Sequence, residues 1–60
     1  MKIYIGCKIK TKLNEIITIT GYRSMRGKYL YLFKDEHNSR GAISRDNLLT
    51  ALDDGARIIQ

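Results

Sequence analysis

Three neighbouring polar residues, Asp35, Glu36 and His37, carry the side chains most suited to acid–base chemistry in this 60-residue sequence. A histidine beside a carboxylate can act as a general base that the carboxylate orients. Neighbouring side chains on an extended chain point in opposite directions, however, and the sequence places no serine or cysteine nucleophile beside them. We therefore expect hydrogen bonding within a polar turn, no metal, no cofactor and no enzymatic activity.

Basic side chains are spaced so that they could bind a polyanion. Lys8, Lys10 and Lys12 alternate, and a strand would project them from one face about 6.6 Å apart, at about 3.3 Å per residue. This spacing is comparable to that of successive phosphates on an extended nucleic-acid strand. The alternative is that the lysines protect an edge strand, because they discourage pairing with a neighbouring molecule.

A second basic group surrounds residues 24–27, which we predict to be a four-residue hairpin loop. It consists of Arg23, Arg26 and Lys28, with Met25 exposed between them. Arginine makes bidentate contacts to phosphate, and methionine packs on bases or in a protein groove. The alternative is an ordinary solvated turn.

The segment 28–34, KYLYLFK, is apolar on both faces when it is read as a strand. Its side chains alternate between Tyr29, Tyr31 and Phe33 on one face and Leu30 and Leu32 on the other. If the leucines join the core, the rings lie outside near Tyr22, where they could stack on bases or form a protein interface. Alternatively, a C-terminal helix covers the rings, and both faces are core.

Glycines and β-branched residues predict short strands separated by turns. We expect these strands at 1–5, 8–13, 15–23, 28–35, 42–44 and 56–60. In 15–23, Ile17 and Ile19 share one face and Tyr22 lies on the other. The leucines of segment 45–54 recur at helical spacing, with Ser44 as N-cap and Gly55 just after the end.

Two acidic residues, Asp53 and Asp54, stand in the last turn of the predicted helix, where they oppose its dipole. They indicate either a turn before Gly55 or a salt link to a basic partner or second subunit. The single Cys7 excludes an internal disulfide, fits a reducing cytoplasm and is expected to be half-buried.

These elements predict one mainly β domain, residues 1–60. It would be a small SH3-like barrel or a strongly bent antiparallel sheet of four to six short strands, with one short C-terminal helix. The succession GCKI, ITITGY, GKYLYL and ISRDNLLTALDDGARII resembles small SH3-like barrel proteins. Many short proteins of phages and mobile elements resemble these barrels too. The resemblance assigns no functional residue, and we expect a non-enzymatic binding module.

The composition favours a polyanionic partner. Eleven Lys and Arg against six Asp and Glu give a net charge of +5, which could also serve only to keep the chain in solution. No segment approaches the roughly 20 apolar residues of a membrane span. We predict nucleic-acid binding; the alternative is a phage- or mobile-element-encoded regulator that binds an acidic surface of a host protein. Either could be a homodimer.

Overall fold

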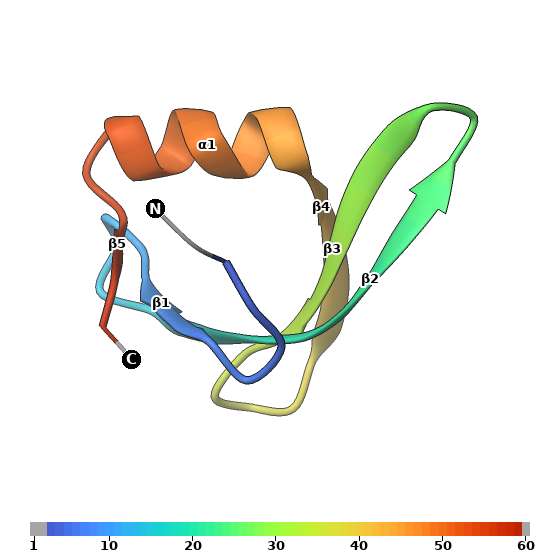
Figure 1. Ribbon diagram of the computed structural model, residues 1–60. Helices are drawn as coiled ribbons and strands as arrows, with labels where there is room; N and C mark the ends of the chain where they lie inside the picture. The colour runs from blue at the N-terminus through green and yellow to red at the C-terminus, as the bar shows by residue number, and fades with distance from the viewer. Residues whose placement is uncertain (1–2, 60) are drawn as a thin grey trace.

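A computed structural model describes residues 3–59 as one bent antiparallel sheet with a helix across its concave side (Figure 1). The elements are β1 (Lys8–Lys10), β2 (Ile16–Met25), β3 (Lys28–Lys34), β4 (Arg40–Ser44), α1 (Arg45–Asp53) and β5 (Arg57–Ile58). The strand order is β4-β3-β2-β1-β5, so β4 and β5 form the two edges and the sheet does not close. The mainly β prediction with one short helix is confirmed, in its bent-sheet form.

The N-terminal half differs from the predicted strands in its boundaries. The predicted strand 1–5 is wrong where the structure describes it, because residues 3–5 form no strand; Met1 and Lys2 lie outside the described residues. β1 ends at Lys10, and the chain reverses at once through a turn in which Asn14 has a φ of 65°. The predicted strand 8–13 is therefore three residues long.

The hairpin between β2 and β3 is tighter than the predicted four-residue loop. Met25 pairs with Lys28, so only Arg26 and Gly27 lie in the turn. Their φ angles are 51° and 77°, and two consecutive positive values are what a type I′ turn requires. Glycine adopts such a φ readily, whereas arginine does so at a cost in strain.

A β-bulge in β2 determines which of its side chains face the helix. Ile19 pairs with Phe33 and Tyr22 pairs with Tyr31, so β2 holds one more residue than β3 over this stretch. The extra residue is Thr20, and it shifts the alternation of β2 by one position. The prediction that Tyr22 lies on the face opposite Ile19 is therefore wrong, because antiparallel partners share a face.

The core lies between the sheet and α1. Its buried residues are Cys7, Ile9, Ile17, Ile19, Leu48 and Ala56. Tyr31 and Phe33 pack against this cluster, whereas Leu30 and Leu32 project from the other face of β3. The prediction that the leucines join the core is thus wrong, while Ile17 and Ile19 are confirmed as core. Cys7 is fully buried instead of half-buried.

The helix begins and ends where the sequence predicts. The hydroxyl of Ser44 accepts a hydrogen bond from the backbone N–H of Asn47 at 3.2 Å, which satisfies one of the free donors of the first turn. Asp46 places a negative charge near the same end. Gly55, with a φ of 119°, follows the C-cap. Nine residues are too few for a stable isolated helix, so α1 is held by packing: Leu48 is buried in the core, and Ala51 and Leu52 pack against it.

Gly41 makes room for the Phe33 ring, and its replacement tests this packing. A Cβ at Gly41 would lie 2.7 Å from Phe33 Cζ. Gly41→Ala should therefore lower the free energy of unfolding by about 1–3 kcal/mol, the usual cost of overpacking. Urea denaturation measures the change. Gly21→Ala is the matched control, because its Cβ would meet Leu32 at an ordinary 3.6 Å; equal losses in both variants would contradict the interpretation.

Candidate nucleic-acid interface

The strand register gathers the basic side chains of the sheet on the face turned away from α1, which we call the outer face. Lys10 pairs with Arg57, and Lys34 pairs with Arg40 on one side and Thr18 on the other. Extending the alternation places every basic strand residue on this face: Lys8, Lys10, Arg23, Lys28, Lys34, Arg40 and Arg57. All are exposed except Lys10, which is partly buried.

The strands contain no acidic residue to balance these cations. The carboxylates lie in turns or in the helix, at Glu15, Asp35, Glu36, Asp46, Asp53 and Asp54. Burying a charge costs free energy, which explains why the core face carries none. Burial does not determine the sign of the exposed charges, so a wholly positive outer face is a separate property of this sequence.

One ion pair forms within residues 3–59, and it lies away from the outer face. Lys12 Nζ and Asp54 Oδ2 are 2.9 Å apart, joining the β1–β2 turn to the end of α1. The hydrogen bond and the charge of Lys12 lower the pKa of Asp54, and those of Asp54 raise the pKa of Lys12. The alternative of a salt link from Asp53 and Asp54 to a basic partner is thus met, for Asp54, by a lysine of the same chain.

This pair also corrects the predicted lysine row. Lys8 and Lys10 share the outer face, but Lys12 lies in the turn after β1 and does not extend the row. The alternative that these lysines protect an edge strand is also wrong, because β1 lies inside the sheet between β2 and β5. The two remaining lysines face solvent from an interior strand.

Tyr22, Tyr29 and Tyr31 form a row on the face opposite the strand cations. The rings of Tyr22 and Tyr29 are stacked with centroids 5.5 Å apart, and Tyr29 meets Tyr31 edge-on at 6.0 Å. Tyr22 and Tyr29 remain 56% and 41% exposed, because the hairpin extends past α1 (Figure 1). Tyr31 is partly covered by the core. The register therefore places these rings and the strand cations on opposite faces, although Tyr29 lines the hollow beside the first turn of α1 together with Lys28 and Arg45.

The residues at the hairpin tip divide between the outer face and the turn. Arg23, Met25 and Lys28 belong to the outer face, and Met25 is 49% exposed. Arg26 occupies the turn itself. The predicted basic group around the tip is thus present, with its methionine exposed among the cations.

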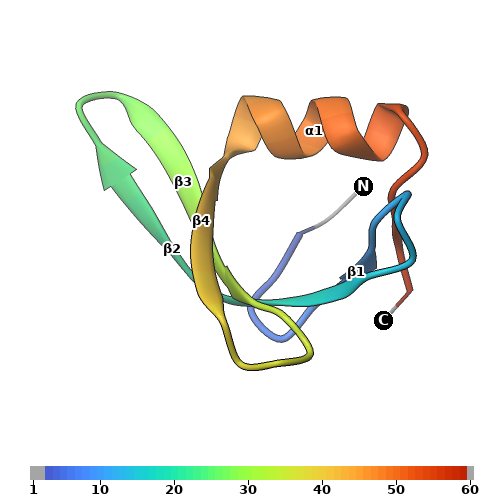
Figure 2. The ribbon, with the colours of Figure 1, turned by 180° about the vertical axis from the view of Figure 1, so that it is seen from behind.

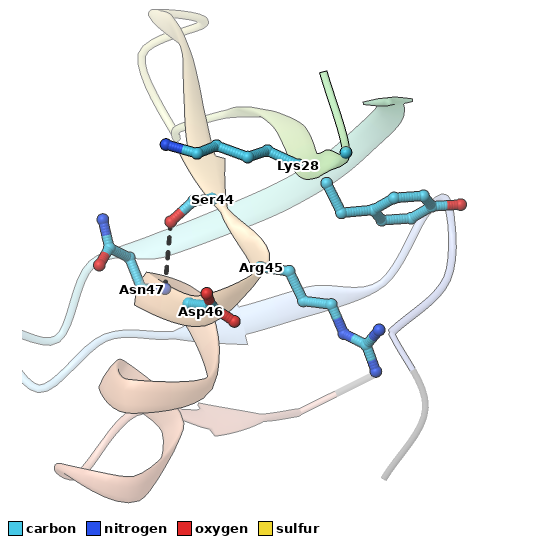
Figure 3. A pocket seen from close by; sticks show the side chains of 7 residues that line it. Lys28, Ser44, Arg45, Asp46 and Asn47 are labelled. Carbon is cyan, nitrogen blue, oxygen red and sulfur yellow. Dashed lines mark hydrogen bonds between the residues drawn. The ribbon is translucent and has the colours of Figure 1, made fainter. Parts of the chain in front are cut away.

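A hollow of ≈ 450 Å³ separates the hairpin tip from the first turn of α1. Its lining includes Lys28 and Arg45, whose side chains point away from each other (Figure 3). Ser44 and Asn47, which are joined by the N-cap hydrogen bond, also line the hollow. The two cations do not converge on one point, so this hollow is not built to enclose a single anion.

Asp35, Glu36 and His37 form the expected hydrogen-bonded turn. Asp35 Oδ1 accepts hydrogen bonds from the backbone N–H groups of His37 at 2.8 Å and Ser39 at 2.9 Å. Glu36 Oε1 accepts one from the N–H of Ile16 at 3.1 Å. Both carboxylates thus hold the backbone of the loop. Within residues 3–59, no three side chains of metal-binding types lie together.

Lys34, Arg40 and Arg57 belong to the outer face although the predicted site omits them. The sequence held a signal for the first, because Lys34 alternates with Leu30 and Leu32. The sequence held no such signal for Arg40 and Arg57, because the face on which they lie follows from pairing with distant strands. The lack of acidic residues within the strands depends on the observed bounds, because the predicted strands 15–23 and 28–35 included Glu15 and Asp35.

Comparisons with known proteins give no relative from which a function could be proposed. No protein-family model matches the sequence, and searches of curated proteins and of solved structures found no significant match. Across residues 3–59, no helix is both long enough and apolar enough to span a bilayer. The resemblance to SH3-like barrels stays a prediction.

The ion pair between Lys12 and Asp54 predicts a pH-dependent effect on stability. Lys12→Gln should lower the melting temperature slightly at pH 7 and low salt, because exposed pairs are weak and screened. The lowered pKa of Asp54 means that its contribution is present above the unfolded-state pKa and is lost as the pH falls through the folded-state pKa. The raised pKa of Lys12 means that its contribution is lost only as the pH rises through its own folded-state value.

Melting temperatures measured from pH 2 to pH 8 check this expectation. The difference between Lys12→Gln and the parent should vanish at the acid end. The matched control is Lys34→Gln, which removes an exposed lysine that forms no ion pair within residues 3–59. A difference for Lys12→Gln that persists unchanged at pH 2 would show that the pair is not its cause.

Proposed function

We propose that this chain is a non-enzymatic nucleic-acid-binding module that contacts phosphates through the outer face of its sheet. The observation that carries the proposal is the register, which directs seven cations and no acid to one face. A nucleic-acid backbone is the polyanion that such a face complements, and its neutralisation by Lys and Arg supplies affinity that is independent of sequence.

Four cations of the predicted site lie on this face, and three further cations join them. Lys8, Lys10, Arg23 and Lys28 come from the prediction; Lys34, Arg40 and Arg57 extend the surface across the sheet. Arg26 adds a charge at the turn beside them. Separate arginines and lysines spread over a face suit a chain of phosphates better than a single compact anion.

Charge supports this proposal more strongly than base stacking does. Tyr22 and Tyr29 already stack on each other, and both belong to the core face of the sheet. Pairs of aromatic rings contribute about 0.5–1.5 kcal/mol beyond their burial, so this pair stabilises the part of the hairpin that extends past α1. We therefore assign the tyrosines to the stability of the hairpin and the cations to binding.

The alternative function, binding to an acidic protein surface, draws on one observation at the hairpin tip. Met25 is 49% exposed between Arg23 and Lys28, and methionine and arginine are enriched in protein interfaces. Affinity capture from a lysate with and without nuclease separates the two functions. Partners that are lost after nuclease treatment support nucleic-acid binding, whereas one stoichiometric protein that is retained supports the alternative.

Salt dependence provides the quantitative test of phosphate binding. If about five phosphates are neutralised, a plot of log affinity against log salt concentration should have a slope near −4 to −5 on duplex DNA. Lys34→Gln and Arg40→Gln should each weaken binding for every sequence and reduce the slope by about one. Fluorescence anisotropy titrations at several salt concentrations measure both effects.

Lys12→Gln is the control for these variants, since it removes a lysine that is paired with Asp54 away from the outer face. Its affinity and slope should match those of the parent. Absence of binding at about 50 mM salt, where electrostatic binding is strong, would overturn the proposal.

A further inference from the structure

The outer face carries a partly buried apolar strip that lies outside the core. Leu30 and Leu32 project from β3 on this face, and neither belongs to the core cluster. Leu32 pairs with Gly21 on β2 and with Ala42 on β4, so small residues flank it on both sides. Figures 1 and 2 show α1 on the opposite side of the sheet, and no other element of residues 3–59 covers the strip.

Cations stand at both ends of this apolar strip. Lys34 and Arg40 pair at one end of β3 and β4, and Arg23 and Lys28 lie toward the hairpin tip at the other. At about 3.3 Å per residue, the distance along β3 from Lys34 to Leu30 is about 13 Å, and Arg23 pairs with Leu30. The distance along β3 from Lys34 to Lys28 is about 20 Å on the same basis. The strip is thus bordered by two positive groups at a defined separation.

We infer that the outer face lies across the major groove of duplex DNA, a reading that rests on the proposed function and specifies its ligand. The major groove of B-form DNA is about 12 Å wide and admits a two-stranded β-ribbon. The separation of the two positive groups suits phosphates on the two strands that border the groove. Leu32, with Leu30 and Ala42 beside it, then meets the base edges, where the thymine methyl group is the apolar contact.

The shape and charge of the face favour this ligand over other polyanions. The sheet bends toward α1, so its outer face is convex and fits a concave groove (Figure 2). The major groove of an A-form RNA duplex is too deep and narrow for side chains to read, and a single strand has no second phosphate wall. A heparin-like polyanion offers charges without an apolar surface for the leucines.

Binding measurements on four probes test the inference. They are a short DNA duplex containing A·T pairs, an RNA duplex of the same sequence, the single DNA strand and a heparin fragment. The DNA duplex should bind tightest. Replacing its thymines by deoxyuracils, which lack the C5 methyl group, should weaken binding of the parent protein.

Leu32→Ser tests the apolar strip directly. It should weaken binding to the DNA duplex about tenfold, equivalent to ~1.4 kcal/mol, and leave binding to the RNA duplex and heparin unchanged. Leu49→Ser is the matched control, because Leu49 is 40% exposed on α1, on the other side of the sheet. Circular dichroism verifies that both variants remain folded.

The outcomes separate this inference from the proposed function. Equal affinity for all four probes, with no effect of Leu32→Ser, would overturn the groove geometry and leave phosphate binding intact. No binding to any of the four probes would overturn both. A loss for Leu32→Ser that is the same on heparin as on the DNA duplex would also overturn the role of the strip, because heparin has no base edges.

Discussion

The antiparallel register between β2 and β3 is the constraint on which both faces of this protein depend. Side chains alternate along a strand, so a shift of one residue exchanges the two faces. The bulge at Thr20 makes this shift within β2. Uninterrupted alternation from Ile19 would carry Arg23 to the core side and Tyr22 outward. With the bulge, Arg23 joins the other cations, and Tyr22 continues the aromatic row.

The outer face can carry exposed cations because α1 covers only the opposite face of the sheet, where the small core lies. Leu48 is buried against the isoleucines of the sheet, and burial of such a side chain contributes about 1.5–3 kcal/mol. Phe33 packs beside them over the space that Gly41 leaves open. The outer face has no structural role in the core, so its composition is free to serve binding.

The acidic residues support the fold locally, and this leaves the cations of the sheet without partners inside residues 3–59. The carboxylates of Asp35 and Glu36 accept hydrogen bonds from backbone N–H groups of the loop and of β2. Asp46 complements the helix dipole, and Asp54 pairs with Lys12. Four of the six carboxylates thus have a nearby structural role outside the strands. The result is a separation of charge: acids at turns and helix ends, cations on the sheet.

The sequence by itself determined the classes of the elements and the ends of the helix. These are local properties: β-branched residues favour strands, Ser44 caps α1, and Gly55 supplies a positive φ after it. Only the tertiary structure decided the faces. The leucines of β3 were predicted to join the core, but the pairing of Phe33 with Ile19 turns the rings toward the core and the leucines outward, and the bulge at Thr20 moves Tyr22 to the side of the rings. Arg40 and Arg57 join Lys34 and Lys10 only through pairing between strands distant in sequence, which no local pattern encodes.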